Sequence, residues 1–167
     1  MTQKSCWILT EGMAGTENQA LGLAEALGFT PEVKRVKPRA PWRWLPVSLW
    51  RAPLNAQSEE ADPLRPPWPD LLISGGRKSI PPALAIKAKS RGKTVAVHLL
   101  NPYGCAKRFD LVVVPRHDHI TGENVVVTEG ALTRITPARL EAALEQHGAR
   151  LGRLARPRLA VLLGGAN

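Results

Sequence analysis

The stretch LLISGGRKSIPPAL, residues 71–84, joins an apolar strand to a helix start through two glycines and two cations. Residues 71–73 have the composition of a buried strand, and Ser79 stands where it can cap a helix whose first turn accepts prolines. Glycines let the backbone turn sharply and approach a ligand, and a helix N-terminus favours an anion. A turn that serves only packing is the alternative. The predicted phosphate or carboxylate site consists of Gly75, Gly76, Arg77, Lys78 and Ser79.

A second junction of the same kind lies at the N-terminus. The apolar run SCWILT, Ser5–Thr10, is followed by a glycine-containing segment and by NQALGLAEAL, Asn18–Leu27, which has helical spacing. Thr16 and Gln19 fit a capping box, and Gly28 fits a left-handed residue just past the helix end. Such turns gather at the carboxyl ends of parallel strands, where ligands bind. The candidate ligand-binding residues therefore include Gly12, Gly15 and Asn18.

The rest of the chain alternates between apolar strands and helices. Further strands are expected at residues 31–36, 94–99, 111–114 and 125–128, and helices at 82–89 and, capped by Thr136, up to a stop at Gly148. Strands this apolar indicate a parallel sheet that is covered on both faces. We therefore expect an α/β fold, a Rossmann-like parallel sheet with helices on both faces.

The composition limits the class of protein. The 167 residues, 44% of them hydrophobic, suit one ordinary domain. Neither a signal peptide nor an apolar run of roughly 20 residues is present, so we expect a soluble, cytoplasmic protein. Cys6 and Cys105 have no metal or redox spacing and are expected to be free thiols. The sequence has no Walker loop, GxGxxG motif or Ser-His-Asp set, and no cofactor is expected.

The charge of the chain needs a reason. Its 23 Lys and Arg against 14 Asp and Glu give a net charge of +9. Such a surface suits nucleic acid, an anionic membrane or phosphorylated small molecules, or it serves solubility alone. Nucleic acid is disfavoured, because the sequence has no zinc-finger spacing, no RNP-like aromatic strand and no basic helix of heptads.

Residues 37–70 are rich in proline and hold four of the five tryptophans. In PWRWLPVSLWR, residues 41–51, aromatic residues and arginines recur near helical spacing, although Pro46 interrupts any long helix. Aromatic side chains flanked by cations suit a headgroup-level contact with the inner membrane or a lipid-linked substrate. Packing beneath a long excursion between strands is the alternative. The residues for this peripheral contact are Trp42, Trp44 and Trp50.

Two histidine positions bear on chemistry. PRHDH, residues 115–119, has no third ligand at a usable spacing, so we predict no metal site. We expect His117 and Asp118 to lie in a loop at the ligand cleft, with the carboxylate fixing the imidazole tautomer. His98 lies inside an apolar strand and is expected to be a hydrogen-bonded core residue.

Several stretches together resemble the mitochondrial-fission ELM family, which is related to glycosyltransferases of the GT-B type. They are EGMAGTENQALGLAEALG at 11–28, PPWPDLLISGGRKSIPPALAI at 66–86, FDLVVVPRHD at 109–118, NVVVTEGALTRITPARL at 124–140 and RPRLAVLLGG at 156–165. Members of that family have two Rossmann-like domains facing each other across a cleft. The resemblance implies an N-terminal domain at residues 1–155, and at 156–167 a linker and the first strand of a second domain.

The resemblance also implies a function. The N-terminal half of a nucleotide-sugar-dependent glycosyltransferase holds an acceptor of unknown identity, so we expect this chain alone to transfer no sugar. The glycine turns are also similar to those of the GlcNAc transferases that make lipid II, in which a His follows the loop glycine. This chain has Thr16 there, which cannot act as a base near neutral pH. Glu11 and Glu17 are then the candidate catalytic bases, with His98 a further substitute, although Glu17 also suits a helix N-terminus. A non-catalytic interaction module or a phosphate-binding domain are the alternatives.

Overall fold

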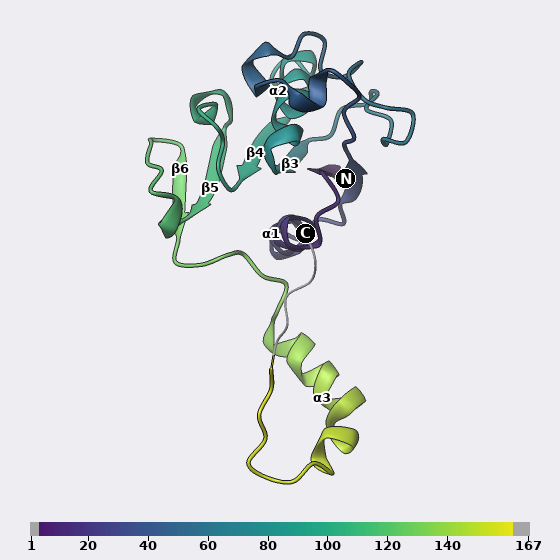
Figure 1. Cartoon of the computed structure of the whole chain (residues 1–167), viewed down its shortest axis with the longest axis vertical. Coiled ribbons are helices and arrows are strands. Elements are labelled where there is room, and N and C mark those ends of the chain that lie inside the picture. Colours follow the sequence, from purple (N-terminus) through teal and green to yellow (C-terminus); the bar gives the residue numbers. More distant parts are fainter. Residues whose placement is uncertain (1–3, 162–167) are drawn as a thin grey trace. The chain divides into compact units, whose positions relative to one another are not determined.

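The computed structural model describes residues 4–161 and divides into two compact units, Met1–Arg134 and Ile135–Asn167. The first unit is a six-stranded sheet in which neighbouring strands are all parallel (Figure 1). Its strands are β1 (Cys6–Thr10), β2 (Glu32–Arg35), β3 (Leu71–Gly75), β4 (Val95–Leu99), β5 (Leu111–Pro115) and β6 (Val125–Thr128). The Rossmann-like α/β fold predicted from the sequence is confirmed.

The strand order is β2-β1-β3-β4-β5-β6. From β1 the chain continues to β2 on one side, and it then returns to β3 on the other side of β1. In doubly wound sheets the ligand crevice opens outside the carboxyl ends of the two strands at which the order reverses. The turns after β1 and β3, which are the two glycine-containing junctions of the sequence, therefore meet at the switch point.

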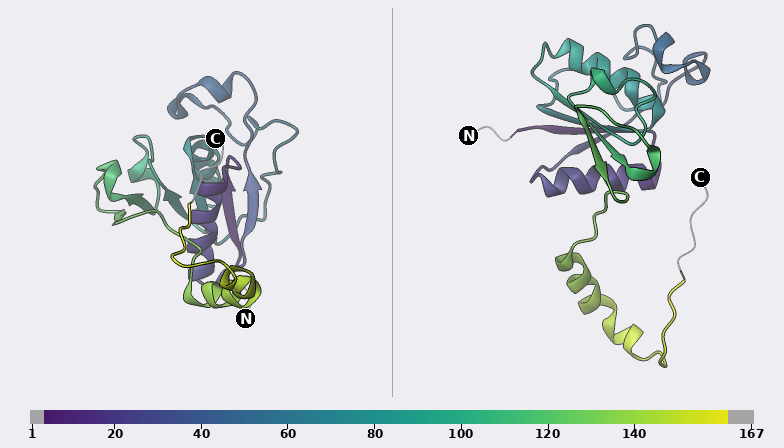
Figure 2. Two further views of the ribbon diagram at one scale, coloured as in Figure 1. Left: turned by 60° about the horizontal axis from the view of Figure 1, so that its bottom comes forward. Right: turned by 90° about the vertical axis from the view of Figure 1, so that its left-hand side faces the viewer.

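One helix covers each face of the sheet (Figure 2). Helix α1 (Ala14–Ala26) packs Ala20 and Ala24 against one face, and α2 (Ile80–Lys89) packs its apolar side against the other. Successive residues of β1 alternate between these two cores, as the strand period of two requires. Cys6 and Cys105 are both buried free thiols, as predicted, and burial raises the pKa of Cys6 to about 11.

Helix α1 begins four residues before the predicted start. Its N-cap is Met13, which makes no side-chain capping bond, and Thr16 is buried within the first turn. The predicted capping box of Thr16 and Gln19 is therefore wrong, because the Thr16 side chain packs inward instead of facing the helix end. The predicted helix end is confirmed: Gly28 has φ +77°, and its N–H bonds back to Glu25 in a Schellman arrangement.

The excursion between β2 and β3 holds two 3-10 helices, Trp42–Trp44 and Val47–Leu49, separated by Pro46. Trp50 is buried, and its indole N–H donates to the Leu45 carbonyl at 3.3 Å. The rings of Trp42 and Trp50 lie 6.4 Å apart. Trp50 is thus a packing residue, whereas Trp44 is exposed.

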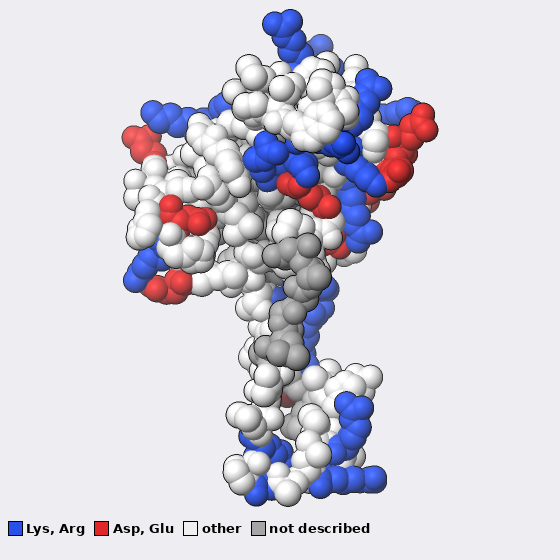
Figure 3. Space-filling view, in the orientation of Figure 1, with Lys and Arg blue, Asp and Glu red and all other residues white. Residues whose placement is uncertain are grey.

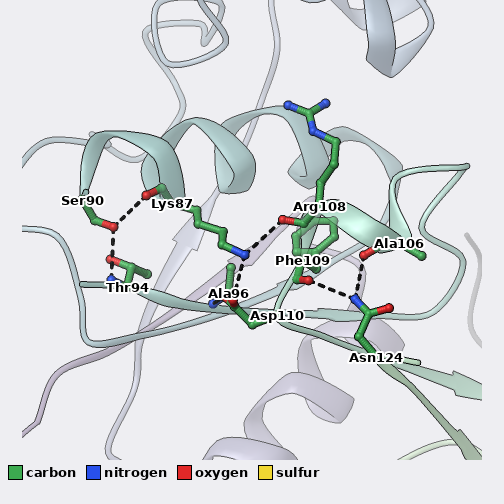
Figure 4. A network of polar contacts seen from close by, with 9 residues as sticks. All are labelled: Lys87, Ser90, Thr94, Ala96, Ala106, Arg108, Phe109, Asp110 and Asn124. Carbon is green, nitrogen blue, oxygen red and sulfur yellow. Dashed lines mark hydrogen bonds and ion pairs between the residues drawn. The ribbon is translucent and has the colours of Figure 1, made fainter. Parts of the chain in front are cut away.

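A polar network ties α2 to the amino ends of β4, β5 and β6 (Figure 4). The Asp110 carboxylate accepts the Ala96 N–H and the Lys87 ammonium, each at 2.8 Å. Partial burial opposes ionisation of Asp110, but these two bonds outweigh it and hold the pKa of Asp110 below its ordinary value. Asn124 donates to the carbonyls of Ala106 and Phe109, each at 2.9 Å. The network fixes the β4–β5 connection in the absence of a long covering helix there.

The second unit contains α3 (Pro137–Gly152). Thr136 caps it as predicted by accepting the Arg139 N–H at 3.3 Å. The predicted stop at Gly148 is wrong: the helix passes through this residue, because one glycine costs only about 1 kcal/mol inside a helix of good formers. Residues 156–161 have no regular structure, and the rest of the predicted strand lies outside the described residues. Between residues 4 and 161, no helix is both long and apolar enough to cross a membrane.

Candidate functional site

The turns after β1 and β3 are bridged by a carboxylate at the switch point. One Glu11 oxygen accepts the backbone N–H of Lys78 at 2.9 Å, and the other lies 3.0 Å from the Lys78 ammonium. The sequence predicts an oxyanion at the turn after β3, and the structure places the chain's own Glu11 carboxylate there. The backbone N–H and the ammonium of Lys78 in this turn are therefore taken up by a carboxylate of the chain itself.

Two glycines make this close approach possible. A Cβ on Gly75 would lie 2.4 Å from the Thr16 methyl group, a distance that real contacts essentially never show. Gly76 has φ +89°, and a Cβ there would lie 3.0 Å from a Glu11 oxygen. The start of α1 and the Glu11 carboxylate thus occupy the space that side chains would take. At Gly15 a Cβ would meet no atom within 4 Å, so packing does not explain this glycine.

The side chains of Arg77 and Ser79 both bind backbone carbonyls. The Arg77 guanidinium donates to the backbone carbonyls of Leu45 and Arg43, at 3.2 and 3.3 Å, and so holds the excursion against the turn. The Ser79 hydroxyl donates to the Gly76 carbonyl at 2.7 Å and makes no capping bond to α2, so the predicted cap is wrong. This bond spans the 3-10 turn Arg77–Ser79, which directly precedes α2.

A pocket of about 470 Å³ opens beside the switch point. It is lined by Glu11, Arg35, Val36, Lys37, Pro38, Arg43, Glu60 and Lys78. Four of these residues are cations and two are acids, an excess of two positive charges that the Glu17 carboxylate beside Arg35 reduces to one. Two larger hollows, of about 760 and 930 Å³, lie elsewhere on the unit, and each has as many acids as cations in its lining.

Glu17, the second candidate base, lies near this pocket. Both oxygens of Glu17 accept from the Arg35 guanidinium, at 3.3 and 3.1 Å. Gly12, with φ +87°, lies beside the Arg35 side chain, because a Cβ there would be 3.7 Å from it. Asn18 is exposed one residue further along α1. The pair of Glu17 and Arg35 fixes a cation at the wall of the pocket.

His117 and Asp118 follow β5, two strands away from β3, and do not line the pocket. The His117 Nε2 lies 3.9 Å from the nearest Asp118 oxygen, which is too long for a hydrogen bond, and the His117 side chain is 77% exposed. The expectation that Asp118 fixes the imidazole tautomer is therefore wrong. Between residues 4 and 161, no group of three or more His, Cys, Asp and Glu could hold a metal ion.

His98 is a core residue, as predicted. Its ring is fully buried, stacks on Phe109 at 4.9 Å, and contacts Ser74 at Nδ1 (2.9 Å) and the Asn101 carbonyl at Nε2 (3.3 Å). A neutral imidazole carries one N–H, so a ring that donates from Nε2 to the Asn101 carbonyl accepts from the Ser74 hydroxyl at Nδ1. Burial lowers the pKa of His98 to about 4, so the ring is neutral near pH 7 and does not face the pocket as a base.

Sequence reasoning missed three of the pocket cations. Arg35 ends β2, and Lys37 and Arg43 come from the excursion that follows it. The neighbourhood of Arg35 could have been found by placing β2 beside β1, because carboxyl ends of parallel strands share one edge. No local sequence pattern around Arg43 predicts that this residue lines the pocket.

A parallel sheet with a cationic pocket at its switch point defines an α/β domain of the doubly wound class, whose ligands bind at the carboxyl edge. Residues 14–167 match the model of the family described as Mitochondrial fission ELM1, and the chain belongs to this family. The membership predicted from the sequence is thus confirmed. No curated protein and no solved structure matches the chain.

Proposed function

We propose that this chain is the acceptor-side domain of a nucleotide-sugar-dependent glycosyltransferase, and that it holds a phosphate or other anionic group of the acceptor at the switch point. One observation carries the proposal: cations from three segments converge on a pocket at the carboxyl ends of β1, β2 and β3. In such a pocket the partial exclusion of water strengthens the attraction for an anion. The four cations are Arg35, Lys37, Arg43 and Lys78.

Glu11 is the better candidate for the base. Transfer to a hydroxyl requires that the acceptor lose a proton, and a carboxylate must lie within reach of it. Glu11 lines the pocket, whereas Glu17 does not, and both of its oxygens are held by the Arg35 guanidinium. In this scheme Lys78 positions the Glu11 carboxylate, and Glu17 positions Arg35. The nucleotide-sugar is held by the second domain of the complete enzyme.

Anion binding is tested by thermal unfolding of the chain with inorganic pyrophosphate. At ten times the dissociation constant, a ligand that binds only the folded state stabilises it by about 1.4 kcal/mol, a shift of roughly 3–6 °C for this size. Lys78→Ala should remove most of this shift. Arg91→Ala, in the exposed loop before β4, is the matched control and should leave it unchanged. No shift in the wild type, or an equal loss in both variants, would contradict the pocket as the site.

Glu11→Gln should strengthen the binding of an anion but slow the transfer of sugar. It removes the negative charge that occupies the turn, so pyrophosphate should bind more tightly by about threefold to tenfold, the equivalent of about 1 kcal/mol. It also removes the base, so transfer by a complete enzyme should fall by a factor of about 10² or more. Weaker anion binding in Glu11→Gln would show that the carboxylate does not compete for the turn.

A non-catalytic binding module is the second candidate, and one observation favours it: Glu11 and Glu17 are both engaged in ion pairs. Radiolabelled nucleotide sugars, offered to a protein that contains this chain and its second domain, separate the two functions. Transfer that Glu11→Gln abolishes would support the enzyme. Pyrophosphate binding without transfer from any of the sugars would support the module.

A further inference from the structure

An exposed aromatic and cationic surface lies on the excursion between β2 and β3. It consists of Trp44, Leu49, Arg39, Arg43 and Arg51, which we call the Trp44 surface. The side chains of Trp44 and Leu49 are 68% and 57% exposed. Figure 1 shows the excursion in dark blue at the top of the first unit, and at this place Figure 3 shows a white area edged by blue Lys and Arg atoms.

The backbone that presents Trp44 is fixed. Arg77 binds the carbonyls on either side of Trp44, and the Trp44 N–H bonds to the Pro41 carbonyl at 3.1 Å. The neighbouring Trp50 anchors the same segment from inside the fold. Trp44 is therefore held outward by a rigid segment, and its exposure does not come from loose packing.

The charge of this region is one-sided. Residues 33–58 contain six Lys and Arg and no Asp or Glu. The other three cations of this stretch pair with acids, but Arg39, Arg43 and Arg51 form no ion pair with any carboxylate in the described part of the chain. Arg43 instead lies over the Trp44 ring, 4.3 Å from its centroid. The Trp44 surface thus keeps its positive charge for an outside partner.

We propose that the Trp44 surface docks on an anionic lipid bilayer. Indole rings favour the headgroup level of a membrane, and an aliphatic side chain beside them reaches the acyl boundary. Arginines near an anionic leaflet each strengthen binding by about fivefold. Nucleic acid suits the surface less well, because Arg43 covers one face of the ring on which a base would stack, and Leu49 gains nothing from a base.

The docking surface adjoins the cationic pocket. Arg43 belongs to both, since it also lines the pocket with Glu11 and Lys78. A bilayer bound to the Trp44 surface therefore brings the pocket to the level of lipid headgroups, where a phosphate-linked acceptor would lie. This consequence rests on the proposed function, but the docking itself does not. Failure of pyrophosphate to bind would leave the docking intact.

Tryptophan emission of the full chain with vesicles tests the proposal. Trp7 and Trp50 are buried and Trp42 and Trp68 are half-buried, so Trp44, the most exposed of the five tryptophans, should contribute most to a change on docking. Vesicles of 30% phosphatidylglycerol in phosphatidylcholine should shift the emission to the blue by roughly 5–10 nm, as expected for an indole that leaves water for the headgroup layer. Pure phosphatidylcholine should give a much smaller shift, and salt should weaken the effect.

Variants decide whether this surface is responsible. Trp44→Ala should abolish the shift, and Arg51→Glu should weaken vesicle co-sedimentation by at least about fivefold. Lys93→Glu, an equal charge change before β4, and Tyr103→Ala, the loss of another exposed aromatic ring, should leave co-sedimentation within about twofold of the wild type. The proposal is overturned if the wild type does not bind anionic vesicles, if Lys93→Glu weakens binding as much as Arg51→Glu, or if a single-stranded oligonucleotide shifts the Trp44 emission and vesicles do not.

Discussion

The two edges of the sheet use their polar residues differently. At the amino edge, the residue directly before a strand bonds to the backbone of a neighbouring segment: Asp70 to Ser5, Thr94 to Pro69, Asp110 to Ala96, and Asn124 to Ala106 and Phe109. At the carboxyl edge, charged side chains pair with each other: Glu11 with Lys78, Glu17 with Arg35, and Arg116 with Glu129. A buried backbone group that loses its partner is expensive, whereas an ion pair with an exposed cation, as at Arg35 and Arg116, exchanges its partner at lower cost. The amino edge therefore stabilises the fold, and the carboxyl edge is where we propose that a ligand binds.

The largest expected effect concerns His98, which is buried just below the carboxyl edge. An unfolded histidine takes up a proton near pH 6.5, but in the folded protein the pKa of His98 is lowered to about 4. The unfolded chain therefore binds more protons between these values. The free energy of unfolding should fall by about 3 kcal/mol as the pH drops from 6.5 to 4. Urea unfolding at a series of pH values measures this change.

Two variants test whether His98 causes this pH dependence of stability. His98→Gln should flatten the stability curve over this range, because the glutamine side chain does not titrate. His117→Gln, at the exposed histidine of the carboxyl edge, should leave the slope in place. Equal slopes in wild type and His98→Gln would place the titrating group elsewhere and would weaken the distinction between a fixed interior and an adaptable edge.

The next effect concerns the backbone contact at the switch point. Gly75→Ala forces a methyl group against Thr16 and should lower the free energy of unfolding by about 2 kcal/mol. Thr16→Ser removes the methyl group that is in the way, so the double variant should recover most of the loss in a double-mutant cycle. If Thr16→Ser gives no recovery, the close approach of α1 to β3 is not what requires a glycine.

The amino edge itself is tested by Asp110→Ala. The change leaves the buried N–H of Ala96 without its acceptor, and it should cost about 1 kcal/mol after allowance for the partial exposure of the carboxylate. Asp110→Asn should recover part of this stability, because an amide oxygen still accepts the bond. Denaturant unfolding at pH 7 compares the three proteins.

The smallest effect is expected from Arg116→Ala at the carboxyl edge. Arg116 and Glu129 are 70% and 77% exposed, so their ion pair should contribute no more than about 0.5 kcal/mol. The same unfolding experiment provides the comparison with Asp110→Ala. Equal losses at the two edges would remove the contrast between them.

The strands of this fold are predictable from the sequence, whereas the helix ends are only partly so. Val125–Thr128 coincides with β6, because an apolar run between polar segments has few other places to lie in a parallel sheet. The start of α1 is missed because capping depends on the direction of the Thr16 side chain. That direction is decided by the contact with Gly75, which lies far away in the sequence.

The candidate site divides in the same way. Glu11, Gly76 and Lys78 are visible in the sequence because they lie in turns with a local signature. Arg43 is not, since its place depends on the path of the excursion and on carbonyl bonds to Arg77, whose partners are 32 and 34 residues away. Trp50 and Trp44 lie in the same kind of local sequence, with prolines and arginines nearby, but only Trp50 is buried in the fold. Long-range packing, which local patterns do not encode, separates these residues.

The length of the excursion between β2 and β3 also determines when β3 becomes available to pair with β1 during synthesis. It separates two central strands that lie side by side: the bond from Ser5 to Asp70, beside the first β1–β3 pair, joins residues 65 positions apart. A ribosome adds roughly 5–20 residues per second. For roughly 3–13 s of synthesis, β1 therefore has no β3 to pair with, although α1 and β2 are completed within this interval. A chaperone that binds apolar strands would find β1 open on that side during this interval.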